Sequence, residues 1–230
     1  MLYNNNRDPE KVLRLMREKL REFEARKRSL RNITKLRAQK IDPKYNVVPP
    51  EGGLVVRVNA KVLDGYEPTT NRWRRIFQTA VSRDNLWITK QEHAALARSE
   101  FPKSLQQRIA RYHLVDNTRG EPPMWQSDEI RRLQMNFDDG QLTGHVRLAT
   151  GSGDRGFDAQ LQGRIEIQSG RVSRFDVVCL GEFWGEGRYT RGAPMGRFPL
   201  AVTFTLADNT DVADRVPPQG SRGWVAGYLR

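Results

Sequence analysis

The sequence predicts an α+β protein, in which a basic N-terminal helix precedes a mostly antiparallel β domain. Three observations carry this prediction. Apolar residues recur at spacings of three and four over residues 13–23, as on one face of a helix. From about residue 133 onward, apolar and polar residues alternate as in strands. An Asp-Gly pair at 139–140 and a Ser-Gly pair at 169–170 suit tight hairpin turns, so we expect an antiparallel meander that forms a sandwich or a partial barrel.

Residues 1–40 are predicted to form a basic amphipathic helical arm. Asp8 and Pro9 suit the start of a helix, because Asp accepts the free amides of the first turn and Pro loses no hydrogen bond there. The apolar stripe is interrupted at Lys27, so a long coiled coil is not expected. The members of the stripe are Leu13, Met16, Leu20 and Phe23.

Most of the surplus positive charge lies in this arm. Residues 1–44 carry 14 Lys/Arg against 6 Asp/Glu, whereas residues 45–230 carry 25 against 21, within a net charge of +12. Clustered positive charge attracts anionic surfaces. We therefore expect residues 8–40 to dock on a protein partner or on an anionic surface, either nucleic acid or anionic lipid. Packing of the stripe on a second copy, which would give a homo-oligomer, stays open.

A Pro- and Gly-rich linker is predicted at residues 41–53, followed by a single β-rich globular domain at 54–230. Short helices are expected near 89–114, where Thr89 and Glu92 have the spacing of a capping box. The predicted strands are residues 54–63, 134–138, 142–149, 159–168, 172–180 and 200–206.

The single cysteine, Cys179, lies in an apolar run and is expected to be a buried, inert thiol that forms no intramolecular disulfide. No apolar run approaches the roughly 20 residues of a membrane span, so no transmembrane segment is predicted. Residues 1–8 lack the apolar stretch of a signal peptide. The sequence as written predicts a cytoplasmic protein, and a periplasmic or exported protein stays open if a leader was removed.

The richest candidate site is the segment 182–191, which combines acidic, basic and aromatic side chains with glycines. Its carboxylates, Glu182 and Glu186, point to a hydrolase or a carbohydrate-binding site. On one continuous strand their backbones would lie about 13 Å apart, whereas retaining glycosidases hold their carboxyl groups about 5 Å apart. A Gly-rich structural turn is therefore the favoured interpretation. The proposed binding residues of this segment are Trp184, Glu186, Arg188, Tyr189 and Arg191.

A second candidate is the run Arg72, Trp73 and Arg74, which combines charge with a ring for stacking, as in single-strand nucleic-acid binders. Trp73 fits the edge of a core equally well. The short apolar pattern of residues 72–81 does not distinguish a strand from a helix.

No catalytic residue, metal ligand or cofactor site is predicted, and the sequence favours a protein that is not an enzyme. His93, His113 and His145 fall in different predicted elements and, with one cysteine, make no zinc site. Residues 151–156 share only their glycines with a phosphate-binding loop. The aspartates of 208–214 do not have the spacing of an EF-hand.

Six stretches of the body carry a resemblance to a known family: SRDNLW (82–87), NTRGEPPMW (117–125), GDRGFD (153–158), RFDVV (174–178), WGEG (184–187) and DRVPPQG (214–220). Through them the chain resembles an uncharacterised bacterial family of planctomycete-type organisms, of unknown function. They span about residues 80–223, most of the body and none of the arm. The resemblance implies one domain and no particular activity, and export is compatible with it.

The expected function is a non-catalytic binding or assembly module whose basic arm docks on an anionic or protein partner. The alternative is a hydrolase or carbohydrate-binding protein with its site around residues 182–191. The two are distinguished by whether Glu182 or Glu186 shares a concave pocket with Arg188 and Tyr189.

Overall fold

The residues described by the computed structural model are 9–27, 47–208 and 210–230. Contacts divide the chain into two units, Met1–Asn46 and Val47–Arg230. Asp8 and residues 28–46, which the sequence assigns to the arm and the linker, lie outside the described residues. The first unit therefore contributes one described element, and the others belong to the second unit.

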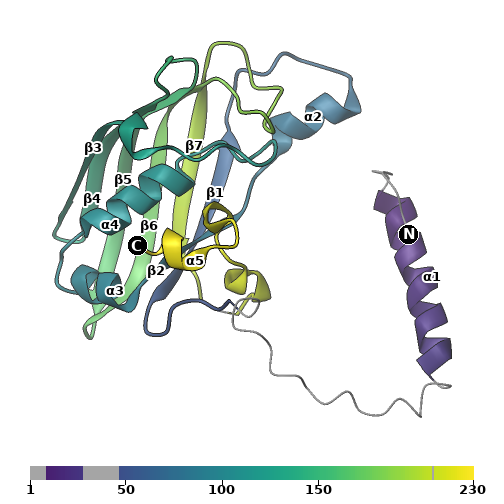
Figure 1. The fold of residues 1–230 in the computed structure, drawn as a ribbon, viewed down its shortest axis with the longest axis horizontal. Coiled ribbons are helices and arrows are strands. Elements are labelled where there is room, and N and C mark those ends of the chain that lie inside the picture. The colour runs from purple at the N-terminus through teal and green to yellow at the C-terminus, as the bar shows by residue number, and fades with distance from the viewer. Residues whose placement is uncertain (1–8, 28–46, 209) are drawn as a thin grey trace. The chain divides into compact units, whose positions relative to one another are not determined.

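The described element of the first unit is the helix α1 (Pro9–Lys27), drawn in purple in Figure 1. A helix is thus present where the apolar spacing predicts one. Glu10 lies in its first turn, where a carboxylate is favoured by the helix dipole. The four side chains of the predicted stripe are all more than half exposed, between 51% at Leu13 and 63% at Met16.

The second unit is built on one seven-stranded sheet. Every neighbouring pair of strands is antiparallel, in the order β2-β1-β7-β6-β5-β4-β3. This confirms the α+β class and the antiparallel meander, which runs from β3 to β7. The strands are β1 (Leu54–Val62), β2 (Asp84–Ile88), β3 (Ile130–Asp138), β4 (Gln141–Ala149), β5 (Gly156–Gln168), β6 (Arg171–Trp184) and β7 (Arg197–Leu206).

Two of the hairpins have the turns that the sequence predicts. Asp139 and Gly140 join β3 to β4 with φ values of 44° and 72°, and Ser169 and Gly170 join β5 to β6 with φ values of 51° and 72°. Positive φ at both central residues defines the turn whose twist matches that of the flanking strands. The turn residues therefore set the register of both hairpins.

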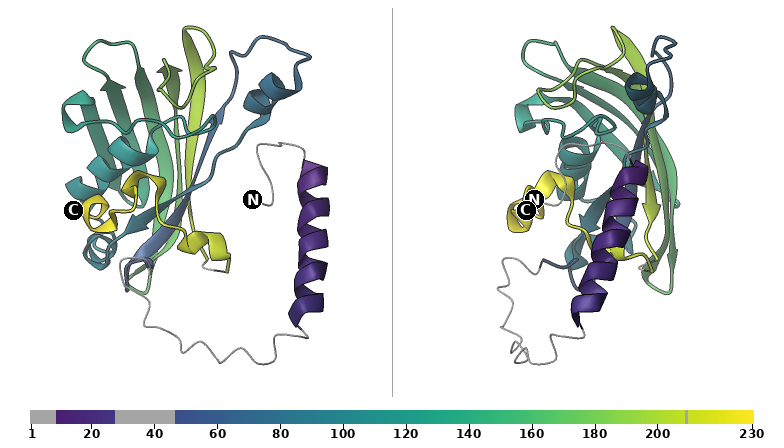
Figure 2. Two further views of the ribbon diagram at one scale, coloured as in Figure 1. Left: turned by 45° about the vertical axis from the view of Figure 1, so that its right-hand side comes forward. Right: turned by 90° about the vertical axis from the view of Figure 1, so that its right-hand side faces the viewer.

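The sheet curves around α3 (Lys90–Leu96), α4 (Lys103–Arg108) and α5 (Val225–Tyr228), which lie on its concave side (Figures 1 and 2). One sheet forms in the described part of the chain, so its shape is closer to a partial barrel than to a two-sheet sandwich. The elements other than strands are α2 (Arg72–Thr79), α3 (Lys90–Leu96), α4 (Lys103–Arg108), the π-helix η1 (Ile109–His113), the 3₁₀ helices η2 (Ser127–Glu129), η3 (Val212–Arg215) and η4 (Gln219–Ser221), and α5 (Val225–Tyr228).

The hydrophobic core lies between the concave face of the sheet and the elements α3, α4, η1 and α5. Inward-facing side chains alternate along the strands, as Phe198, Leu200, Val202 and Phe204 do on β7. Cys179 on β6 belongs to this core, and burial raises the pKa of its thiol, as expected for an inert cysteine. No helix in the described part of the chain is long and apolar enough to cross a membrane.

A buried ion pair fastens the C-terminal end to the helices. Arg108 Nη1 lies 2.6 Å from Glu92 Oε2, and its other nitrogens donate to the carbonyls of Tyr228 and Leu229. Burial alone would raise the pKa of Glu92, but hydrogen bonds from Arg108, Thr89 and others outweigh it, so this pKa lies below its usual range. The predicted capping box between Thr89 and Glu92 is confirmed at the start of α3.

Candidate functional site

The helix α2, which carries Arg72, Trp73 and Arg74, lies against residues 192–195, directly after the proposed segment 182–191. Phe77 of α2 lies against the loop that joins β6 to β7, since a Cβ placed on Gly192 would be 3.2 Å from Phe77 Cε2. Arg74 and the stretch 192–195 line a common cavity. Residues more than 100 positions apart in the chain are therefore neighbours.

This α2 cavity has a volume of about 350 Å³. Tyr66 lines it, and the Tyr66 hydroxyl is buried with no hydrogen-bond partner among the described residues. Burial raises the pKa of Tyr66 to about 12, so its hydroxyl keeps its proton and remains a donor at neutral pH. Apolar walls with a few polar groups are typical of small-ligand sites. The lining residues are Gly65, Tyr66, Glu67, Pro68, Thr69, Arg74, Phe77, Gln78, Gly192, Ala193, Pro194 and Met195.

The helix α2 presents the proposed residues Arg72, Trp73 and Arg74 at this end. Asn71 caps the helix by accepting from the backbone N–H groups of Trp73 at 2.9 Å and Arg74 at 3.2 Å. Along its full described length, α2 buries none of its residues. Trp73 is 47% exposed, so it is neither a core residue nor a fully solvated ring.

Glu186 organises the loop that follows β6. Its Oε2 atom accepts from the backbone N–H of Gly192 at 2.6 Å and lies 3.8 Å from Arg119 Nη1. Arg119 is itself buried and paired with Asp116. The Glu186 carboxylate is therefore an acceptor that holds the loop, in agreement with the structural interpretation of its sequence.

Trp184, the last residue of β6, has a structural role. Its Nε1–H donates to the Gly153 carbonyl at 2.9 Å, and the Arg197 guanidinium lies 4.1 Å from the ring centroid. The ring covers Gly156, where a Cβ would come within 2.1 Å of it. Trp184 and Glu186 line a shallow cavity of about 420 Å³.

The remaining proposed residues, Arg188, Tyr189 and Arg191, are exposed on the loop. The Arg188 guanidinium lies 5.4 Å from the Tyr189 ring centroid, and Tyr189 is 64% exposed. Neither Arg188 nor Tyr189 lines the cavity that holds Glu186.

The two carboxylates of the alternative hydrolase site are engaged separately. Glu182 pairs with Arg197 at 3.2 Å on the exposed face of the sheet, whereas Glu186 accepts from the loop backbone. A glycosidase needs both carboxyl groups at one bond, with one of them free to donate a proton. This geometry does not favour hydrolysis at residues 182–191.

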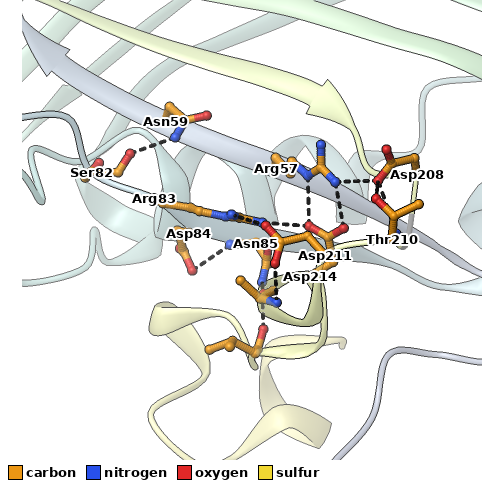
Figure 3. Close-up of polar contacts among 12 residues, drawn as sticks. Arg57, Asn59, Ser82, Arg83, Asp84, Asn85, Asp208, Thr210, Asp211 and Asp214 are labelled. Carbon is orange, nitrogen blue, oxygen red and sulfur yellow. Dashed lines mark hydrogen bonds and ion pairs between the residues drawn. The ribbon is translucent and has the colours of Figure 1, made fainter. Parts of the chain in front are cut away.

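An ionic cluster that the sequence did not indicate lies where the chain leaves β7 (Figure 3). Asp214, buried, accepts from Arg57 at 2.9 Å and from Arg83 at 2.8 Å. Asp208 pairs with Arg57, and Asp211 pairs with Arg83. The hydrogen bond from Arg57 is the main cause that lowers the pKa of Asp214.

In this cluster the carboxylates of Asp208, Asp211 and Asp214 are paired with arginines. Two arginines from β1 and from the residue before β2 neutralise them, so the segment after β7 is fastened over those strands. No group of three or more His, Cys, Asp or Glu side chains that could hold a metal ion occurs among the residues described.

A buried polar group inside the core combines a histidine, a tyrosine and an aspartate. His113 Nε2 lies 2.6 Å from Tyr228 Oη, and His113 Nδ1 lies 3.2 Å from Asp84 Oδ2. Such arrays activate a hydroxyl for nucleophilic attack. His113 and Tyr228 are each only 2% exposed, and burial raises the pKa of Tyr228 well above its usual value. The group therefore joins α5 to η1 inside the core.

A scan against protein-family models finds no match, and searches of curated proteins and of solved structures find none either.

Proposed function

We propose that this protein is a non-catalytic binding or assembly module that docks through α1 on an anionic or protein partner. One observation carries the proposal: the apolar stripe of α1 is exposed along the described helix. An exposed apolar face on a charged helix is typical of segments that bury that face against a partner or a membrane surface.

The arrangement of charge on α1 supports an anionic partner. With 3.6 residues per turn, Arg14, Arg17 and Arg21 fall along one side of the stripe, where Glu10 and Glu24 also fall, so the net charge of this side is positive. Guanidinium groups beside an apolar stripe can reach anionic headgroups while the stripe enters the interface. The basic and amphipathic character assigned to residues 8–40 rests, beyond Lys27, on sequence alone.

The test compares binding of the full chain to vesicles of phosphatidylcholine with and without phosphatidylglycerol, and to double-stranded DNA, across a range of salt concentrations. We expect binding to the anionic vesicles that weakens as salt rises, and loss of that binding in a Leu20→Gln/Phe23→Gln variant. Ala25→Gln, on the opposite side of α1 by helical spacing, is the control and should bind as the unmodified chain does.

The outcomes separate the possible partners. DNA binding that Leu20→Gln/Phe23→Gln leaves unchanged would assign the arm to nucleic acid. A larger mass by light scattering, lost in the same variant, would assign it to self-association. Affinity that survives deletion of residues 1–46 would contradict docking through the arm altogether.

A further inference from the structure

A groove lined by three arginines lies on the face of the sheet opposite the core, where β3, β4 and β5 run side by side. Its volume is about 550 Å³, and the turn between β4 and β5 closes one side of it. We call it the arginine groove. Its lining residues are Arg131, Arg132, His145, Arg147, Ala149, Thr150, Gly151, Ser152, Gly153 and Asp158.

The strand register brings these guanidinium groups together. Arg132 on β3 stands directly opposite Arg147 on β4. Like charges directly opposite each other destabilise a sheet unless a group of opposite charge lies between them. The register shifts between Ile130 and Arg132, and this bulge lets the consecutive residues Arg131 and Arg132 line the same groove. Bulges of this kind re-aim side chains and are frequent beside functional sites.

The positive charge of the groove is only partly neutralised. Asp158 contributes the one carboxylate among the described lining residues, and its Oδ1 is 2.6 Å from His145 Nε2. Arg147 Nε lies 3.8 Å from Asp158 Oδ2. Arg131 and Arg132 donate hydrogen bonds to neutral acceptors, the Thr150 carbonyl at 3.4 Å and Gln134 Oε1 at 2.9 Å. Each guanidinium has five N–H groups, so most of these donors have no anionic acceptor among the residues that the structure describes.

We propose that the arginine groove binds a small phosphorylated compound, whose phosphate oxygens accept hydrogen bonds from Arg131, Arg132 and Arg147. The planar guanidinium fork matches the oxygens of a phosphate, and charge-assisted bonds of this type are the strong ones. The turn at 150–153 has the glycines of a phosphate-binding loop without its lysine, and in this fold the neighbouring arginines supply the missing charge.

The surroundings of the groove favour a small ligand over a polyanion. Beyond the groove, the exposed arginines of the same face are already paired with carboxylates: Arg164 and Arg174 with Glu166, and Arg197 with Glu182. A nucleic acid needs a basic track that follows its backbone over many phosphates. The groove spans three strands and offers room for one or two phosphate groups. The proposal does not depend on α1 and stands apart from docking through the arm.

The test is calorimetric titration of the full chain with inorganic phosphate, with pyrophosphate and with a short single-stranded DNA. Pyrophosphate is expected to bind more tightly than phosphate, with an affinity that falls as salt rises. Arg131→Gln and Arg147→Gln should each weaken pyrophosphate binding about tenfold, the loss of one charge-assisted bond. Arg174→Gln is the matched control: Arg174 lies on the same face but is already paired with Glu166 and Asp176, so its loss should leave binding unchanged.

Several results would overturn the proposal. One is the absence of pyrophosphate binding, and another is equal affinity in the unmodified chain and in both groove variants. A third is an equal loss in Arg174→Gln, which would make the effect one of net charge. DNA binding without pyrophosphate binding would assign the groove to a polyanion. Circular dichroism of each variant shows whether it is folded. Arg131→Gln removes no ion pair found among the described residues, so the test remains valid with this variant if Arg147→Gln unfolds.

Discussion

At the scale of single residues, the partner of a side chain decides what the side chain does. The aspartates of 208–214 have the chemistry of a calcium site, yet Arg57 and Arg83 occupy their oxygens. The Glu186 carboxylate has the chemistry of a general acid, yet it accepts from the loop backbone. In both cases the partners come from distant parts of the chain or from backbone geometry, which residue types alone do not reveal.

The first prediction concerns Asp214, whose side chain is buried between the two arginines. Asp214→Asn should lower the free energy of unfolding at pH 7 by about 2 kcal/mol, because both arginines lose a charged acceptor while remaining partly solvated. Urea unfolding measures the change. Asp176→Asn is the control: Asp176 pairs with Arg174 on the exposed face, so its loss should cost about 0.5 kcal/mol or less.

Asp214→Asn should also change how the free energy of unfolding depends on pH. The pKa of Asp214 is lowered in the folded chain, so the unfolded chain binds more protons as pH falls. The stabilisation is complete above the unfolded carboxyl pKa of about 3.9 and is lost as pH falls from there through the folded value. Unfolding measured between neutral pH and pH of about 3 should therefore show a smaller acid-dependent loss in Asp214→Asn. An unchanged acid-dependent loss would contradict this role for Asp214.

At the scale of elements, the structure separates what local signals determine from what distant contacts determine. The hairpins β3–β4 and β5–β6 could be predicted because the residues at 139–140 and 169–170 favour positive φ and so set their own turns. The position of β1 between β2 and β7 could not, because its pairing with β7 joins residues about 140 positions apart and leaves no local trace.

The candidate site, too, could be predicted where local composition marks its residues and not where distant contacts assemble them. The aromatic and basic residues at 72–74 and 184–191 stood out by composition, but in the structure Arg74 shares a cavity with residues 192–195, whereas Trp184 and Glu186 line another. Tyr66 and Met195, which line the α2 cavity, carry no unusual composition and could not be singled out. Arg131 and Arg132 form a visible doublet, but their neighbour Arg147 is identified only through the register of β3 and β4.

The second prediction compares the caps of two helices. Asn71→Ala removes the cap of α2 and Thr89→Ala removes the cap of α3, and each change should destabilise its helix by about 1 kcal/mol. The described residues of α2 are all unburied, so Asn71→Ala should speed hydrogen exchange within α2 and leave global unfolding nearly unchanged. Thr89→Ala should lower global stability, because α3 buries Leu96 in the core. Equal effects on global unfolding would contradict this distinction.

At the scale of the whole molecule, the chain divides between a unit that contributes α1 and a unit with its own core. The described buried cluster is drawn entirely from the second unit, from Val55 to Tyr228. The Arg108–Glu92 pair fastens the C-terminal carbonyls inside the same unit. The described core of Val47–Arg230 is therefore built from residues of that unit.

The third prediction follows from this division. Deletion of residues 1–46 should change the free energy of unfolding of the remaining chain by no more than about 0.5 kcal/mol, because no described core residue is removed. Leu200→Ala in the full chain shows that the measurement is sensitive: this side chain is fully buried on β7, and its truncation should cost about 2–5 kcal/mol. A loss above about 1 kcal/mol on deletion would mean that the stripe of α1 is covered by the body in solution. The stripe would then serve the stability of this chain, and docking of α1 on a partner would need the helix to detach first.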